Sequence, residues 1–155
     1  MKKHFALAMA ALLLAGCAPW KIVVAPSEPL NGYGKVEFAG WDDAPALAAL
    51  PEGAKGEKIK GDIGVMEKQT SADFVKWASE RKDGANGKTL SLKMELQEYV
   101  PNGLMSDGHI TWLATFSSGG KVVAQSSIVE KYSGGSKTLI FMSVYTMTKR
   151  FVELN

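Results

Sequence analysis

Residues Thr89–Tyr99 read TLSLKMELQEY, and this stretch decides the fold class. Apolar residues occupy every second position and polar residues the positions between them: Leu90, Leu92, Met94 and Leu96 against Ser91, Lys93, Glu95 and Gln97. Because successive side chains of a strand point to opposite faces, this alternation predicts a half-buried β-strand. A strand of this kind is typical of an antiparallel sheet that is covered on one face.

Further strands are predicted on both sides of this stretch. His109–Phe116 and Lys121–Lys131 flank Ser117-Ser118-Gly119-Gly120, a four-residue connection of hairpin composition. Upstream, Lys21–Pro26 (KIVVAP) is rich in β-branched residues and stops at a proline, which predicts a first strand. Val36–Ala39 is a further candidate strand.

Two longer helices are predicted. In Thr70–Lys82, one helical face holds Phe74, Trp77, Ala78 and Arg81. Thr70 and Asp73 have capping-box spacing and predict the start of this helix, and Gly84 stands just past its end. Ser136–Leu154 also has helical spacing, although its Thr, Val and Tyr content leaves a strand open; the spaced residues are Ile140, Val144, Met147 and Phe151.

The stretch between the first strand and Thr70 is rich in Gly and Pro. Asn31-Gly32 predicts a turn, and Asp43–Leu50 a short helix with Pro45 near its first turn. Gly53–Gly64 is expected to be irregular. The whole order predicts an α+β fold, an antiparallel sheet of about four or five strands with two helices packed on one face.

Composition bounds the classes of function. The chain has 155 residues, 46% of them hydrophobic, which suits one ordinary domain, expected at residues 22–155. Its 18 Lys and Arg residues against 16 Asp and Glu residues include Lys2 and Lys3. Without these two the charge is balanced, which argues against nucleic-acid binding. A single cysteine excludes a disulfide scaffold and a cysteine-based zinc site, and we expect no cofactor and no metal.

The first residues predict an export signal over residues 1–16. Lys2 and Lys3 precede Phe5–Leu14 (FALAMAALLL), an uncharged stretch of ten residues. As a helix it would be about 15 Å long, half of a hydrocarbon core of about 30 Å. A charged start, a short apolar stretch and small residues before the cut describe a signal peptide rather than a membrane span.

Leu14-Ala15-Gly16-Cys17 resembles the lipobox of bacterial lipoproteins. The resemblance implies cleavage between Gly16 and Cys17, lipidation of the Cys17 sulfur and acylation of the new amino group. Ala18 stands where inner-membrane lipoproteins of many Gram-negative bacteria usually carry Asp, so the family rule implies the outer membrane. The alternative is an ordinary secretory signal that ends by chance in a cysteine.

Residues 17–21 are then the lipidated cysteine and a short tether. Residues 18–21 reach about 14 Å when extended, which would hold the domain close to the bilayer. Trp20 lies three residues from the lipid and could contact the membrane interface, where tryptophan favours the headgroup level.

The overall layout also resembles that of small bacterial envelope lipoproteins related to the amino-terminal domain of TolB. The shared features are the lipobox, an immediate KIVVAP strand, an alternating strand, a hairpin with a Ser-Gly-Gly tip, and Gly134-Gly135 before a last helix. This resemblance implies an envelope location and a noncatalytic role, and it supplies no catalytic residues.

Candidate catalytic motifs are weak. Gly87-Lys88-Thr89 matches the tail of a phosphate-binding loop, but Lys82 stands where its first glycine belongs and a strand follows, so a turn is expected. His109 has Ser106 and Asp107 close by in sequence. Three neighbours on one loop rarely attain triad geometry, so we interpret His109 as a loop histidine.

Candidate binding residues are equally ambiguous. Asp42-Asp43 could bind a cation, although capping of the following helix is favoured. Asp83–Gly87 lacks the ligand pattern of an EF-hand. The four tryptophans, Trp20 included, could form a sugar or lipid platform; Trp77 and Trp112 are instead expected in the core, and Trp41 is left undecided.

Two classes of function remain open. The first is a noncatalytic binding or assembly module, anchored through Cys17 to the periplasmic side of the outer membrane, that binds an envelope protein through an edge strand or apolar patch. The second is a small periplasmic enzyme or ligand carrier with a site in residues 31–64. We favour the first, because the sequence shows no nucleophile with a histidine base and no metal-ligand pattern.

Overall fold

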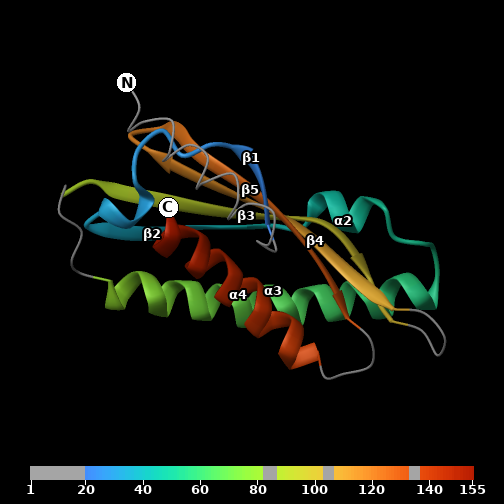
Figure 1. Cartoon of the computed structure of the whole chain (residues 1–155). Coiled ribbons are helices and arrows are strands. Elements are labelled where there is room, and N and C mark those ends of the chain that lie inside the picture. Colours follow the sequence, from blue (N-terminus) through green and yellow to red (C-terminus); the bar gives the residue numbers. More distant parts are fainter. Residues whose placement is uncertain (1–19, 82–86, 103–106, 133–136) are drawn as a thin grey trace.

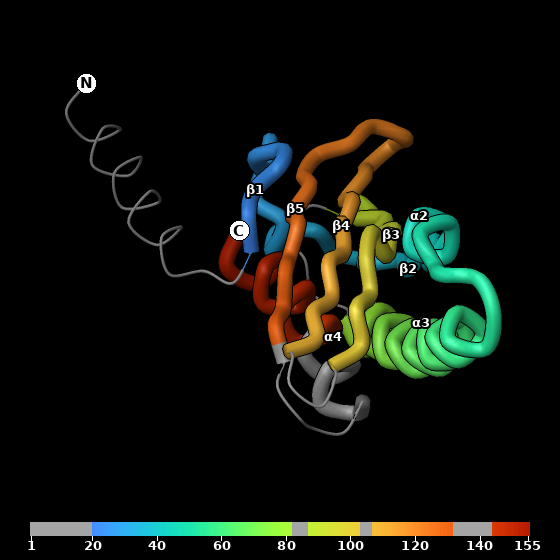
Figure 2. The backbone as a smooth tube through the Cα atoms, turned by 90° about the vertical axis from the view of Figure 1, so that its right-hand side faces the viewer, coloured from blue at the N-terminus to red at the C-terminus, as the bar shows by residue number. Residues whose placement is uncertain are grey.

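The computed structural model describes residues 20–81, 87–102, 107–132 and 137–155. Within these ranges a five-stranded sheet has the order β1-β5-β4-β3-β2. Helices α3 and α4 lie against one face of the sheet, and no described helix covers the other face (Figures 1 and 2). The elements are β1 (Trp20–Val24), the 3-10 turn η1 (Leu30–Gly32), β2 (Lys35–Asp42), α2 (Ala44–Ala48), α3 (Ala54–Glu80), β3 (Thr89–Val100), β4 (Gly108–Ser118), β5 (Lys121–Tyr132) and α4 (Lys137–Leu154).

The predicted α+β class is confirmed, with one difference in the sheet. Strands β1, β5, β4 and β3 pair antiparallel with their neighbours, whereas β2 pairs parallel with β3, from Lys35 beside Thr89 to Asp42 beside Glu95. Parallel neighbours need a long crossover connection, and helices α2 and α3 supply it. The sheet is therefore mixed rather than purely antiparallel.

The alternation of β3 is confirmed side chain by side chain. Leu90, Leu92, Met94 and Leu96 are all fully buried. On the same face, β4 contributes Trp112 and Phe116, and the ring of Phe116 stacks on Phe151 of α4 at 5.4 Å. The apolar face of β3 is thus the centre of the core between the sheet and the helices.

The hairpin between β4 and β5 is tighter than expected. The strands extend to Ser118 and from Lys121, so the turn has only two residues, Gly119 and Gly120. Both have positive φ, 56° and 77°, the backbone of the two-residue turns that match strand twist. The predicted four-residue connection is therefore wrong in length but correct in place.

The expectation that Gly53–Gly64 is irregular is wrong, because this stretch forms the first half of α3. Thr70 does not start the helix; it lies fully buried in the middle of it. An unbroken buried stripe at helical spacing runs along α3: Gly56, Ile59, Ile63, Met66, Thr70, Phe74 and Trp77. Burial of this stripe outweighs the cost of interior glycines, about 1 kcal/mol each.

The other predicted helices are confirmed. α4 is a helix over Lys137–Leu154, with Val144 and Phe151 fully buried as the spacing predicted. The buried hydroxyl of Thr148 donates a 2.9 Å hydrogen bond to the Val144 carbonyl, so this polar group is satisfied inside the core. The short helix expected at Asp43–Leu50 is α2, and the turn expected at Asn31-Gly32 lies in η1.

Candidate functional site

The predicted lipidation and cleavage residues, Gly16 and Cys17, lie outside the described residues, so the description begins at Trp20. Trp20 is half-buried, and its ring packs edge-on against Phe151 at 5.7 Å. This contact ties the first strand to the C-terminal helix. The membrane-interface role of Trp20 stays a prediction.

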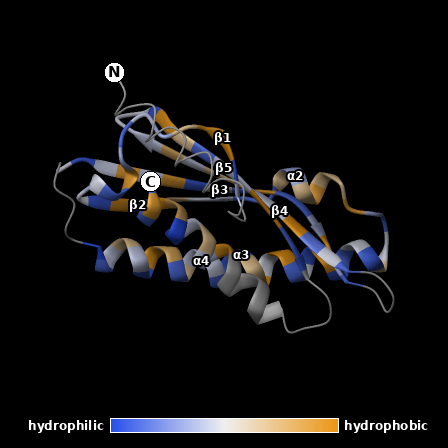
Figure 3. Ribbon diagram, in the orientation of Figure 1, coloured by the Kyte–Doolittle hydropathy of each residue, from blue (hydrophilic) through white to orange (hydrophobic). Residues whose placement is uncertain are grey.

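β1 presents exposed apolar side chains at the edge of the sheet. Among the described strands it pairs only with β5, so it stands at one edge of the sheet. Lys21 is its only charged residue, and Figure 3 shows a hydrophobic strip on it. We define the β1 edge patch as the exposed aliphatic residues Ile22, Val23 and Val24 together with Val122 and Val129 of β5, which are between 38% and 55% exposed.

The opposite edge of the sheet is protected by charge. β2 carries Lys35 and Glu37, both exposed, and ends at Asp42. Its register with β3 shifts between Phe38 and Gly40, where Gly40 has a φ of 130°. Charges and bulges of this kind discourage pairing with another strand. β1 also has a register shift, but it carries one charged residue, Lys21, against three on β2, so it is the edge better suited to bind an extended partner.

The Gly87-Lys88-Thr89 motif forms the structural turn into β3. The Lys88 ammonium lies 2.7 Å from Oε2 of Glu28, and the Lys88 carbonyl accepts a hydrogen bond from the Lys35 N–H. The buried Tyr33 hydroxyl donates a 2.6 Å hydrogen bond to Oε1 of Glu28. The hydrogen bonds from Lys88 and Tyr33 hold the pKa of Glu28 below its ordinary value. These contacts join the chain before β2 to the start of β3.

His109 has a partner that the sequence does not indicate. Its Nε2 lies 2.9 Å from Oε2 of Glu98, across the pairing of β4 with β3. Of its sequence neighbours, Asp107 is exposed and Ser106 lies outside the described residues. Glu98 and His109 meet only because β3 and β4 are antiparallel, a register that spacing along the chain could not predict.

The contacts of the Asp42-Asp43 pair are structural: Asp42 binds the start of α2 and a lysine of β3. Oδ1 of Asp42 accepts a 3.2 Å hydrogen bond from the Ala44 N–H at the start of α2, and Oδ2 pairs with Lys93 at 3.0 Å. The Lys93 contact and then the Ala44 hydrogen bond lower the pKa of Asp42. Asp43 occupies the N-cap position without a side-chain capping bond. Among the described residues, no three His, Cys, Asp or Glu side chains are placed to hold a metal ion.

The predicted core positions of two tryptophans are confirmed. Trp77 and Trp112 are core residues, 5% and 0% exposed. Trp41, which the sequence left undecided, is half-buried against the core, and its buried indole N–H has no hydrogen-bond partner in the described part of the chain. Trp20 and Trp41 lie on the two outer strands of the sheet, so the four tryptophans do not form one platform.

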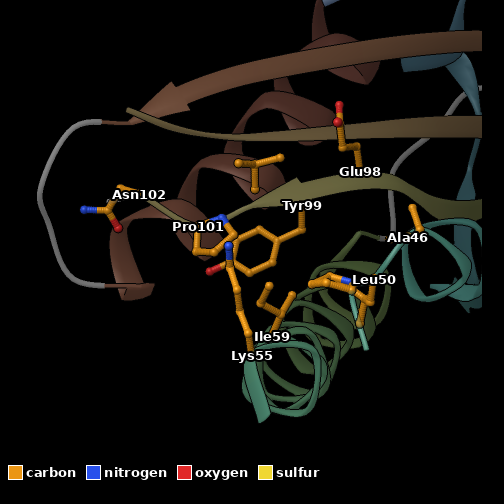
Figure 4. A pocket seen from close by; sticks show the side chains of 11 residues that line it. Ala46, Leu50, Lys55, Ile59, Glu98, Tyr99, Pro101 and Asn102 are labelled. Atoms are coloured by element: carbon orange, nitrogen blue, oxygen red, sulfur yellow. The ribbon is translucent and has the colours of Figure 1, made fainter. Parts of the chain in front are cut away.

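A cavity of about 430 Å³ lies between α2, the start of α3 and the end of β3 (Figure 4). Its apolar lining includes Ala46, Leu50, Ile59 and Val100, and its polar lining includes Lys55, Tyr99 and Asn102. We call it the α2–β3 cavity. Tyr99 is 8% exposed, and Figure 4 shows its ring projecting from β3 toward Lys55 and Pro101.

The sequence predicted only one wall of this cavity. The lining residues from α2 to Ile59 lie within the predicted 31–64 region, but the opposite wall comes from the end of β3. Tyr99 closes the alternating stretch and Pro101 stops it, which signals a strand end but not what packs beside it. A second hollow of about 380 Å³ lies nearby, lined by α2, Glu52 and Glu57 among others.

Comparisons with known proteins do not assign a family. No family model matches the chain, and no curated protein matches it. Among solved structures, the chain is similar to the PelC dodecamer from Paraburkholderia phytofirmans, in two crystal forms, one of them of a variant. The TM-scores are 0.44 and 0.43 at 12% identity, covering 83% of this chain and 94% of that chain. A likeness of this size assigns no function, and the TolB-like layout stays a prediction.

Within the described residues, no helix combines the length and apolar character that crossing a membrane requires.

Proposed function

We propose that the protein is a lipoprotein, anchored through Cys17 to the periplasmic side of the outer membrane, that acts as a noncatalytic binding or assembly module of the envelope. The observation that carries this proposal is the β1 edge patch. Ile22, Val23 and Val24 stand at an open sheet edge only a few residues after the lipobox cysteine. The surface best suited to bind another protein is thereby the part of the domain closest to the proposed anchor.

The physical mode of binding would be addition of a strand. An extended segment of a partner can pair with the free backbone groups of β1, while its apolar side chains pack on the exposed valines. A tether of about 14 Å keeps this edge near the bilayer. That restriction raises the effective concentration of the edge toward a partner embedded in or bound to the membrane.

The noncatalytic part of the proposal is supported by the contacts of the candidate catalytic and metal-binding side chains, which pair with other residues of the fold. His109 pairs with Glu98, Lys88 pairs with Glu28, and Asp42 accepts hydrogen bonds from Ala44 and Lys93. Each of these groups fastens two elements of the fold together. Of these groups only Glu98 borders the α2–β3 cavity, whereas nucleophilic or acid–base catalysis needs several such groups to converge on one site.

A second candidate function, a ligand carrier, is favoured by one observation. The α2–β3 cavity takes one of its walls from residues 46–59, inside the region where the sequence placed this alternative. Its volume falls in the range of about 300–1,000 Å³ that is usual for small-molecule sites. The two functions can coexist, because the cavity is lined by α2, α3 and β3 whereas the patch is on β1 and β5.

The β1 proposal is tested by photo-crosslinking in cells. A photoreactive amino acid at Val23, which is 50% exposed, is expected to crosslink to a specific envelope protein. The matched control is Val75, 57% exposed on α3 and distant from β1. Val23→Lys introduces an edge charge and should remove the association and produce the phenotype of the deletion strain, whereas Val75→Lys should do neither.

Both lysine variants should keep the melting temperature of the parent protein, since both positions are exposed. Identical crosslinks from Val23 and Val75, or full function of Val23→Lys at normal abundance, would contradict a docking role for β1.

A further inference from the structure

The α2–β3 cavity combines an apolar lining with two unused hydrogen-bond donors. Tyr99 is about nine-tenths buried and borders the cavity, and its hydroxyl has no hydrogen-bond partner in the described part of the chain. Lys55 reaches the same cavity from the first turn of α3 and makes no ion pair with a described residue. Lys55 is exposed, and the Tyr99 hydroxyl is not among the buried unpaired polar atoms, so both donors are open to an acceptor that enters the cavity.

The charges around the cavity favour an anionic acceptor. Glu98 also borders the cavity, but its carboxylate pairs with His109 and points away from Tyr99 in Figure 4. Glu52 and Glu57 line the neighbouring hollow instead. The first turn of α3 is the positive end of the helix dipole, and its N-cap, Gly53, makes no side-chain capping bond, although Glu57 lies in the same turn. A negatively charged group beside Tyr99 and Lys55 would therefore be bound by two donors in a mostly apolar site.

The apolar part of the lining requires that the ligand have an apolar part as well. Ala46, Leu50, Ile59 and Val100 offer no hydrogen bonds from their side chains to a fully polar anion. At about 30 Å³ for each water-sized group, a volume of about 430 Å³ has room for roughly a dozen non-hydrogen atoms. This size suits a short alkyl chain with a small charged head.

We propose that the α2–β3 cavity binds a single-chain anionic amphiphile, with Tyr99 and Lys55 on its anionic head and the α2, α3 and β3 side chains around its alkyl chain. This proposal rests on the second candidate function, the ligand carrier, and names its ligand class. The shared chemistry is a carboxylate or phosphate on one alkyl chain, which either a fatty acid or a single-chain phospholipid fragment supplies.

Isothermal titration calorimetry with three probes of equal chain length tests the proposal. The protein is made with residues 1–17 replaced by an ordinary cleavable secretory signal, so that neither the lipid nor the apolar stretch Phe5–Leu14 is present. Decanoate and monodecyl phosphate, which distinguish the two sources, are titrated against decyltrimethylammonium. We expect one molecule of at least one anionic probe to bind per chain, with at least tenfold preference over the cationic probe. Equal binding of the anionic and cationic probes, or no binding of either anion, would overturn the proposal.

Two substitutions locate the binding in the cavity. Tyr99→Phe keeps the buried ring and removes only the hydroxyl, and Lys55→Met keeps the chain and removes the charge. Each should weaken the preferred anion about tenfold, as expected for a hydrogen bond to a charged group. Lys58→Met, on the exposed surface of the same helix, is the matched control and should not change the affinity. Unchanged affinity in both cavity variants would place the binding elsewhere and overturn the assignment.

These results are independent of the β1 proposal. Loss of amphiphile binding in Tyr99→Phe leaves the Val23 crosslink intact, and loss of the crosslink in Val23→Lys leaves amphiphile binding intact. Failure of one proposal is therefore distinguishable from failure of the other.

Discussion

A side chain on Gly56 would collide with the backbone of Pro51: a Cβ built on Gly56 lies 1.9 Å from the Pro51 carbonyl oxygen. Gly56 is buried in the first turn of α3, and Pro51 lies in the connection from α2. The absence of a side chain therefore lets the start of α3 pack directly on that connection. Pro51, Lys55 and Ile59, which flank this contact, all line the α2–β3 cavity.

Gly56→Ala is expected to destabilise the protein by about 1–3 kcal/mol, because the backbone of the connection must move to admit the methyl group. Gly61 and Gly64 are matched controls in the same helix, since a Cβ at either meets no atom within 4 Å. Gly61→Ala and Gly64→Ala should each stabilise the protein by about 0.5–1 kcal/mol. Urea denaturation measures all three. The same sign of effect at Gly56 and Gly61 would contradict the close packing.

Substitutions at two adjacent residues of β3 test the orientation of the sheet. Leu92 is fully buried and Lys93 is exposed. Leu92→Lys puts an unpaired charge in the core and should cost on the order of 3 kcal/mol or more, or prevent folding. Lys93→Leu removes a surface contact with Asp42 and should change stability little. Thermal melts compare the two; similar losses would mean that the faces of β3 are assigned wrongly.

Glu28 predicts a dependence of stability on pH. Hydrogen bonds from Lys88 and Tyr33 lower its pKa from the ordinary value of 4.5 in the folded protein. The unfolded chain therefore takes up a proton first as the solution is acidified, so this stabilisation is complete above about pH 4.5 and is lost as the pH falls through the lowered pKa.

Glu28→Gln should reduce the fall in melting temperature between about pH 5 and pH 3, and high salt should weaken the wild-type effect because the Lys88–Glu28 ion pair is accessible to solvent. Glu37→Gln, an exposed position on β2, is the control and should follow the wild type. If the melting temperature of Glu28→Gln falls with pH as steeply as that of the wild type, then other groups cause the acid sensitivity.

Local patterns along the chain predicted most of the fold. The alternation of Leu92 with Lys93 and the 4-3-4 spacing ending at Phe151 each reflect burial within one element, and the structure confirms both. The first part of α3 was not predicted, because Gly61 and Gly64 are residues typical of loops. The stripe that includes Ile59 and Ile63 is buried only when the helix packs against the sheet. Tertiary burial overrode local propensity there.

The candidate sites were less predictable because they join distant parts of the chain. Glu98 meets His109 through the register of two strands, and Tyr99 and Lys55 come to line one cavity through the packing of a helix beside a strand end. Neither pair has a signature in sequence spacing. The parallel pairing of β2 with β3 was missed for the same reason, since it depends on where the crossover helices lie.

Cys17 carries the proposed location. Cys17→Ala is expected to leave an uncleaved precursor and to abolish labelling with a radioactive fatty acid, because the resemblance to the lipobox assigns both processing steps to this cysteine. Mass spectrometry and membrane fractionation measure the result. An unchanged mass and unchanged membrane association would contradict the lipoprotein assignment.

The spacing between anchor and domain is expected to matter as well. Insertion of about twenty Gly and Ser residues after Ala18 gives a linker with an average span of roughly 25 Å, which lets β1 leave the bilayer surface. Function should weaken although lipidation and stability remain normal. An equal insertion between Gly119 and Gly120, at the hairpin tip, lengthens the chain without changing the tether and is the control. Equal loss from both insertions would contradict a role for the tether.

Complementation by an untethered domain tests the central claim most directly. Residues 1–17 are replaced by an ordinary cleavable secretory signal, so that the same domain is exported without lipid, and its folding is checked by its melting temperature. A module that serves a membrane-bound partner through β1 loses the effective concentration that the anchor provides. We predict that the folded, soluble form fails to complement a deletion strain and that restoring the lipobox with Cys17 restores function; full complementation by the untethered domain would contradict the account.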